Sequence, residues 1–143
     1  MTETYLDHFI HAHKASYKVA LTELELGLKT THWMWFIFPQ ASGLGKSEVA
    51  KFYAIENLQE AISFARHEYL GKNYCNCLRA ILSHRDTPIE DILGEVDAKK
   101  LKSSITLFKR TGVKGELSTL IREVSEQSFF GDECQYTLKL NLE

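Results

Sequence analysis

The sequence is short of the residues that hold small secreted proteins together. It has three cysteines in 143 residues, an odd number, and Cys75 and Cys77 are separated by a single residue. This arrangement excludes the disulfide framework of a cysteine-rich secreted domain and favours a reducing compartment. The first residues, 1–4, lack the basic start and apolar core of a signal peptide. We therefore expect a cytoplasmic protein.

Long apolar runs and an excess of positive charge are also missing. The longest apolar stretch, residues 33–39, is far shorter than the ~20 residues needed to span a bilayer. The formal net charge is -2, and no run of basic residues marks a tail that could bind nucleic acid. We therefore expect neither a membrane nor a nucleic acid as a partner.

No group of histidines and cysteines has the spacing of a metal site. His67 and Glu68 resemble the start of an H-E-x-x-H zinc motif, but Gly71 stands where the second histidine is required. The three histidines of segment 8–13 lie far from the cysteine pair, and they are expected to be partly exposed on a helix. We predict that the protein needs no metal and no cofactor.

What the sequence does contain is the pattern of a helical domain. Hydrophobic residues make up 44% and charged residues 25%, which is the balance of an ordinary globular protein of one domain. Apolar residues recur at helical spacing in at least five segments. The pattern predicts a mainly α fold, a compact single-domain helical bundle over residues 1–143. Its helices would be linked by an aromatic irregular segment and a Gly-rich loop.

Glycines and capping residues predict where several helices begin and end. Gly27 is expected to end the first helix, and Gly71 to end a helix that begins at Asn57. The next helix is expected to begin at Asn73 and a later one at Asp97. Beyond residue 132, apolar residues alternate as they do in a strand, but the run is too short to decide.

The segment from His32 to Ser47 breaks the helical pattern. Residues 32–40 are aromatic without a helical stripe, which predicts a buried, irregular or briefly extended segment. Gly43 and Gly45 then form a loop before a helix that Ser47 would cap. Free backbone N–H groups at such a helix start can bind an anion. The structural alternative is a serine-capped loop, and a P-loop is not matched because Gln40 stands where glycine is required.

Three blocks of the sequence carry the signature of a known family. The pattern K-x-x-H-W-M-W-F-I-F-P-Q is met by residues 29–40 and G-L-G-x-S by 43–47. The pattern D-x-x-K-L-x-S-S-M-T-L-F is met by 97–108, with Ile105 in place of methionine. These blocks resemble the family of the domain of unknown function 1810, some members of which are called calpastatin. The resemblance implies a compact, mainly helical fold, and it supplies no established activity and no catalytic residues.

Polar residues within these blocks predict a ligand pocket. Rigid aromatic side chains bracketed by polar groups are a common lining of small-molecule sites, and Lys100 with a hydroxyl one turn further on suits an anion or a carbonyl. We predict one pocket between segments His32–Ser47 and Asp97–Phe108. Its candidate residues are His32, Trp33, Trp35, Gln40, Gly43, Gly45, Ser47, Asp97, Lys100, Ser103, Ser104 and Thr106.

Three kinds of function fit these features. In the first, the pocket binds or processes a small anionic metabolite, a nucleotide or an ADP-ribose-like compound, with phosphate at the Gly-rich loop and a base against the tryptophans. The second is a non-catalytic protein-interaction module. The third is a catalyst that uses His32 or Asp97 as acid or base, for which the sequence shows no partner geometry.

Overall fold

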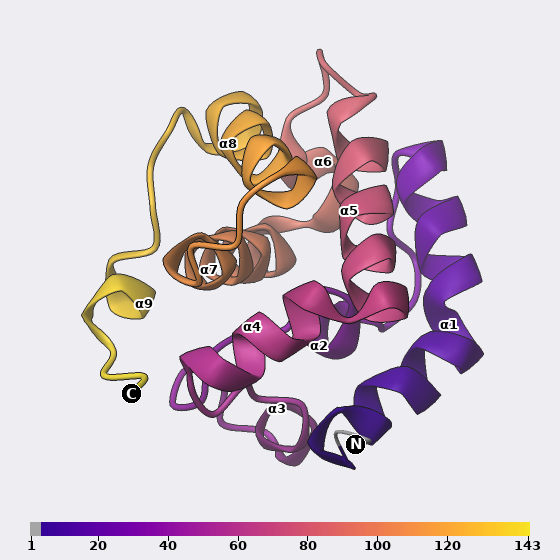
Figure 1. The fold of residues 1–143 in the computed structure, drawn as a ribbon. Helices are drawn as coiled ribbons and strands as arrows, with labels where there is room; N and C mark the ends of the chain where they lie inside the picture. The colour runs from indigo at the N-terminus through magenta and orange to yellow at the C-terminus, as the bar shows by residue number, and fades with distance from the viewer. Residues whose placement is uncertain (1–3) are drawn as a thin grey trace.

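Nine α-helices of very different lengths make up the computed structural model, which describes residues 4–143 (Figure 1). Within these residues there is no strand, and a single parallel bridge joins Ala41 to Ile55. The elements are η1 (Thr4–Leu6), α1 (Asp7–Leu26), α2 (Met34–Ile37), α3 (Glu48–Phe52), α4 (Leu58–Arg66), α5 (Glu68–Leu82), α6 (Ile89–Leu93), α7 (Glu95–Arg110), α8 (Glu116–Phe129) and α9 (Gln135–Lys139). The predicted fold class, a mainly α bundle, is confirmed. Among the described helices, none is long and apolar enough to cross a membrane.

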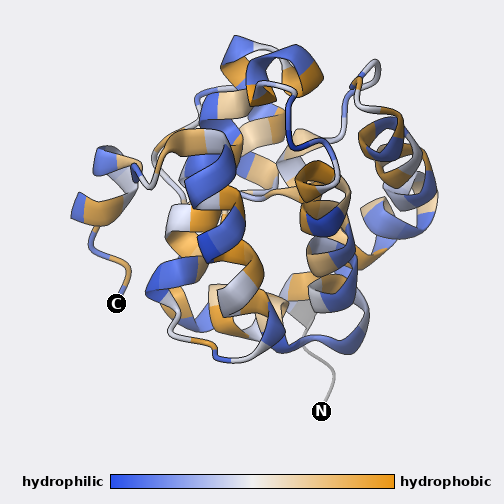
Figure 2. Cartoon of the chain, turned by 90° about the horizontal axis from the view of Figure 1, so that it is seen from above, coloured by the Kyte–Doolittle hydropathy of each residue, from blue (hydrophilic) through white to orange (hydrophobic). Residues whose placement is uncertain are grey.

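The core forms around α5, which packs between α1 and α8, while α4 and α7 close the bundle (Figure 1). Figure 2 shows hydrophilic and hydrophobic residues on different faces of the helices, as expected when one stripe of each helix is buried. Three rings from α4, α5 and α7 meet at the centre. The Tyr74 and Phe108 ring centroids lie 4.7 Å apart, and those of Phe64 and Phe108 lie 5.4 Å apart. Hydrophobic burial of such rings is the main force that holds the helices together.

The first helix is continuous and ends where glycine predicts. Gly27 has a φ of 80°, a left-handed conformation that costs glycine little, and its N–H is bonded to carbonyl groups of the last turn of α1. The predicted end of this helix is therefore confirmed.

The predicted helix end at Gly71 is wrong. The chain breaks at His67, whose Nδ1 accepts hydrogen bonds from the N–H groups of Tyr69 and Leu70, both at 3.2 Å, and so caps α5. Gly71 lies inside α5, where a Cβ atom would come within 2.2 Å of the carbonyl oxygen of Ala65. This glycine is required for a close approach between two helices, and not for a turn.

A buried imidazole joins α1 to its neighbours, contrary to the expectation that His13 is partly exposed. His13 Nε2 donates to the carbonyl oxygen of Phe36 at 2.7 Å, and its Nδ1 accepts from the side-chain amide of Asn73 at 3.0 Å. Burial lowers the pKa of His13 to about 4, although the bond to Phe36 acts to raise it. Asn73, predicted to start a helix, is instead a buried residue within α5 that holds this neutral imidazole.

The remaining differences concern three short segments. The aromatic segment contains one helical turn, α2, and the residues on both sides of it, 32–33 and 38–40, are irregular or extended. Helix α7 begins at Glu95, two residues before the predicted Asp97. Of the alternating residues of the C-terminal segment, Tyr136 and Leu138 lie in α9, and Leu140 and Leu142 follow this helix without forming a strand. Thr137 of α9 is buried and its hydroxyl is hydrogen-bonded to that of Ser103 at 2.8 Å, so burial decides the conformation here.

Candidate functional site

A surface pocket of about 390 Å³ lies where the Gly-rich loop meets α7. One wall comes from Trp35, Gln40 and the loop residues 44–47. The opposite wall is the first half of α7, and the start of the α9 segment, with Tyr136, completes the lining. The pocket forms here because α2 packs against α7, which brings the aromatic segment beside the helix.

The charged residues that line this pocket are all of one sign. Lys46, Lys99 and Lys100 are among its lining residues, and no aspartate or glutamate is. Lys46 and Lys99 are exposed, while Lys100 is partly buried and its Nζ lies 5.7 Å from the centre of the Trp35 ring. A concave surface with several cations and no carboxylate raises the local concentration of anions.

A single carboxylate behind the pocket orients two lysines. Asp97 Oδ2 lies 2.9 Å from Lys29 Nζ, and its Oδ1 lies 3.3 Å from Lys100 Nζ. Lys29 Nζ also lies 5.1 Å from the centre of the Trp33 ring, so each lysine is next to Asp97 and above a tryptophan. The side chain of Lys29 is 8% exposed and that of Lys100 is 30% exposed. Lys29 is therefore the more buried partner of Asp97, and Lys100 presents its charge to the pocket.

Glu23 of α1 fixes the chain that leads into the aromatic segment. Its carboxylate accepts hydrogen bonds from the N–H of Thr30 at 2.8 Å, the hydroxyl of Thr31 at 2.6 Å and the indole N–H of Trp33 at 2.9 Å. Burial alone would raise the pKa of Glu23, but these hydrogen bonds lower it to about 2. The carboxylate thus holds Trp33 in the core and sets the position of Trp35, two residues later.

The structure brings half of the predicted site residues together and separates the others. Trp35, Gln40, Gly45, Ser47, Lys100 and Ser103 line the same pocket. Asp97 lies directly behind it and reaches it through Lys100. His32 is exposed beside the pocket, with its ring centroid 6.4 Å from that of Trp35. Gly43 belongs to the loop but is not part of the lining.

Three predicted residues instead hold the fold together. Trp33 is buried in the core, where its indole N–H donates a hydrogen bond to Glu23. The hydroxyl of Ser104 is hydrogen-bonded to that of Tyr74 at 2.9 Å. Thr106 donates to a carbonyl of the preceding turn, and its oxygen accepts from the N–H of Cys134. The hydroxyl groups of Ser104 and Thr106 are therefore engaged in hydrogen bonds within the fold, away from the lysine pocket.

Sequence reasoning missed Lys46, Lys99 and Tyr136. The two lysines had a signal, because Lys46 lies within the predicted loop and Lys99 precedes Lys100. Tyr136 had none, since the path of the C-terminal segment follows from contacts with α7 that the sequence pattern does not reveal. Glu23 was missed as well, although its place beside Leu24 on the apolar side of α1 is unusual for a carboxylate.

Comparison with known proteins agrees with this arrangement of helices. The family model described as protein of unknown function (DUF1810) matches residues 3–141. The chain belongs to the DUF1810 family. The conserved hypothetical protein Rv1873 from Mycobacterium tuberculosis is 34% identical, with a TM-score of 0.87 and 93% of each chain covered. No curated protein matches the sequence. The resemblance found in the three sequence blocks is thus confirmed, and DUF1810 membership brings no ligand or reaction with it.

Within residues 4–143, no group of three or more histidine, cysteine, aspartate or glutamate side chains is placed to hold a metal ion. That folding and function need no metal stays a prediction.

The thiols of the two cysteines of α5 are shielded by burial. Burial raises the pKa of Cys75 to about 11, and it raises the pKa of the fully buried Cys77 further. Burial therefore keeps both thiols of this DUF1810 protein protonated near neutral pH.

Proposed function

We propose that this DUF1810 protein binds a small anionic metabolite with a planar ring, a nucleotide or an ADP-ribose-like compound, in the pocket between the Gly-rich loop and α7. The observation that carries the proposal is the group of three lysines, unaccompanied by any lining carboxylate, beside Trp35 and Tyr136. The volume of about 390 Å³ lies within the range of small-molecule sites.

The lysines supply the attraction for phosphate. Helix α3, which follows the loop, has only five residues and Ser47 already caps it, so its dipole contributes little. Lys46 on the loop and Lys99 and Lys100 on α7 face the pocket from two walls and can contact different oxygens of one phosphate or pyrophosphate group. The attraction is electrostatic and is expected to weaken as salt concentration rises.

Trp35 and Tyr136 supply surfaces for a ring. Trp35 is partly exposed and Tyr136 is 77% exposed, so both can contact a ligand. Stacking of a base on an aromatic side chain contributes roughly 1–3 kcal/mol. Gln40 and Ser103, which also line the pocket, offer hydrogen bonds that could distinguish one ring from another.

The test is a thermal-shift and calorimetry series with AMP, ADP-ribose and NAD, and with adenosine as the uncharged control. We expect the phosphate-bearing compounds to stabilise the protein, and a ligand at 100 times its Kd adds about 2.7 kcal/mol. Lys46→Gln and Lys99→Gln should each weaken binding, whereas Lys72→Gln, an exposed lysine of α5 outside the pocket, should not. Equal binding of adenosine and AMP, or no binding at millimolar concentration, would contradict the proposal.

A non-catalytic interaction module is the second candidate. Val96 and Tyr136 are 68% and 77% exposed and both border the same pocket, so a protein partner could cover them. The double variant Val96→Ser/Tyr136→Ser separates the two candidates. It should abolish the binding of a protein partner, whereas binding of phosphate to the lysines should remain measurable. The catalytic alternative has no comparable observation, since Asp97 is held by two lysines and His32 does not line the pocket.

A further inference from the structure

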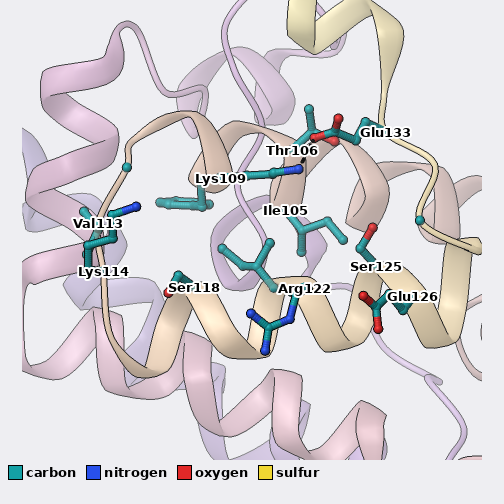
Figure 3. Close-up of a pocket in the computed structure, with 14 residues that line it drawn as sticks. Ile105, Thr106, Lys109, Val113, Lys114, Ser118, Arg122, Ser125, Glu126 and Glu133 are labelled. Atoms are coloured by element: carbon teal, nitrogen blue, oxygen red, sulfur yellow. Dashed lines mark ion pairs between the residues drawn. The ribbon is translucent and has the colours of Figure 1, made fainter.

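A second cavity, of about 480 Å³, lies between α7 and α8 (Figure 3). It shares no lining residue with the pocket described above. The two hollows use different turns of α7, residues 105–109 here and 96–103 there. The α7–α8 cavity therefore has its own chemistry.

The floor of the α7–α8 cavity is apolar. Ile105 and Phe108 of α7 and Ile121 of α8 line it with side chains that are almost wholly buried, and Val113 extends this surface. Contact with such a surface removes a hydrocarbon group from water and is favourable in proportion to the area covered. The floor thus offers a small apolar contact to an aromatic or aliphatic body.

One pair of opposite charges on the rim is already satisfied. Figure 3 shows Lys109 extended toward Glu133, and the Nζ to Oε2 distance is 3.1 Å. These two residues neutralise one another across one wall of the cavity. They leave little charge there for a ligand.

The α8 side of the rim carries two cations, Lys114 and Arg122. Ser118, Arg122 and Ser125 follow one another at helical spacing along the face of α8 that lines the cavity, and Lys114 lies just before the helix. In the part of the chain that the structure describes, neither Lys114 nor Arg122 forms an ion pair. An anionic group lying over the apolar floor would be within the field of both.

Glu126 limits how much negative charge the ligand can carry. It lines the same cavity one turn after Arg122, and it is not in an ion pair within the described residues. This carboxylate repels a phosphate or a polyanion more strongly than a monoanion, so a monoanion can pair with Arg122 at lower cost. This distinguishes the cavity from the lysine pocket, which has no acidic lining residue.

We propose that the α7–α8 cavity is a binding site for amphipathic monocarboxylates. The hydrocarbon body lies against the partly exposed Val113 and the edge of the floor at Ile121, and the carboxylate pairs with Arg122, assisted by Lys114. The planar guanidinium of arginine matches the two oxygens of a carboxylate and can hold both at once. The site is independent of the proposed nucleotide pocket, so failure of either proposal leaves the other standing.

The experiment uses three probes with the same body, 4-phenylbutyrate, 4-phenyl-1-butanol and 4-phenylbutylamine. Each is titrated into the protein and followed by two-dimensional amide NMR. We expect 4-phenylbutyrate to give saturable shifts in segments 105–113 and 118–126. The alcohol and the amine should bind at least tenfold more weakly, and a tenfold change corresponds to about 1.4 kcal/mol. Equal binding of the alcohol would overturn the assignment of Arg122 as the carboxylate partner.

Variants locate the site in the same titration. Arg122→Gln should weaken 4-phenylbutyrate at least tenfold and Arg122→Lys less, because lysine keeps the charge and loses the planar fork. Lys72→Gln is the matched control, since it removes a cation from α5 that lines neither cavity. Arg122 is exposed, so these variants should fold. The proposal is wrong if the shifts instead occur around Trp35 and Tyr136. It is also wrong if 4-phenylbutyrate gives no saturable shift up to about 10 mM, ten times the Kd of a millimolar ligand.

Discussion

Lys29 and Lys100 contact the same carboxylate, and their replacement should have very different consequences. Both lysines reach Asp97, at 2.9 Å and 3.3 Å, and each lies above a tryptophan ring. They differ in exposure, 8% for Lys29 and 30% for Lys100. The perturbation is a matched pair of single substitutions, Lys29→Met and Lys100→Met, which remove the charge and keep most of the apolar stem.

The expected magnitudes follow from what each substitution leaves behind. Lys100→Met leaves Asp97 paired with the more buried Lys29, and a partly exposed ion pair contributes about 0–1 kcal/mol, so the loss should not exceed about 1 kcal/mol. Lys29→Met leaves Asp97 with only the weaker partner. A fully stranded buried charge costs about 3–5 kcal/mol. Because Asp97 is 18% exposed and keeps Lys100, we expect about 2–3 kcal/mol.

Urea unfolding at neutral pH measures both values, with the slope of the transition as a check that the unfolded states are comparable. The same variants enter the nucleotide titration, where Lys100→Met should weaken binding. If Lys100→Met destabilises the protein as much as Lys29→Met does, the assignment of Lys100 to the pocket is refuted, because its charge would then be holding the fold together.

Three further outcomes follow from buried groups. Because the pKa of His13 in the folded protein is about 4, the free energy of unfolding should be highest above pH 6.5 and fall as pH drops from 6.5 to 4. In His13→Gln, urea unfolding at a series of pH values should no longer show this dependence. Glu23 has a lowered pKa of about 2, so its contribution is present above pH 4.5 and is lost as pH falls from 4.5 toward 2. Glu23→Gln should remove that lower slope and cost about 3 kcal/mol in urea unfolding at pH 7, as charge-assisted hydrogen bonds disappear. Gly71→Ala should destabilise by at least about 2 kcal/mol, opposite in sign to the usual gain of alanine in a helix, because of the contact with Ala65; an unchanged melting temperature would disprove it.

The fold class could be predicted from the sequence because helical periodicity is a local property. Where a boundary depended on a local device, such as the left-handed Gly27, prediction and structure agree. Where it depended on a distant contact, they differ. Gly71 looks like a helix end along the sequence, yet it is explained by its distance from Ala65. The C-terminal residues alternate like a strand, but Thr137 is buried against Ser103, and this tertiary contact favours α9.

The candidate site could be predicted in part for a similar reason. Polar residues next to rigid aromatics marked two segments, and the structure brings Trp35 and Gln40 beside Lys100 in one pocket. The sequence pattern could not tell which of two nearby aromatic residues faces the pocket and which faces the core. Trp33 and Trp35 are alike along the sequence, and only the hydrogen bond from Trp33 to Glu23 assigns one to the core. Lining residues from the last segment depend on its packing against α7, which no local signal encodes.

Two of the three lysines that line the pocket, Lys46 and Lys99, form no ion pair among the described residues, and this supports the proposal that the pocket serves a ligand. The chain has 19 acidic residues and a net charge of -2, so carboxylates to neutralise Lys46 and Lys99 are plentiful. None lines the pocket, although like charges facing one another in a concave site repel and weaken the folded state. A protein selected only for stability would gain by placing a carboxylate beside Lys46 and Lys99, as Asp97 is placed beside Lys29 and Lys100. Departures from local rules of this kind are expected where function, and not folding, determines the residue.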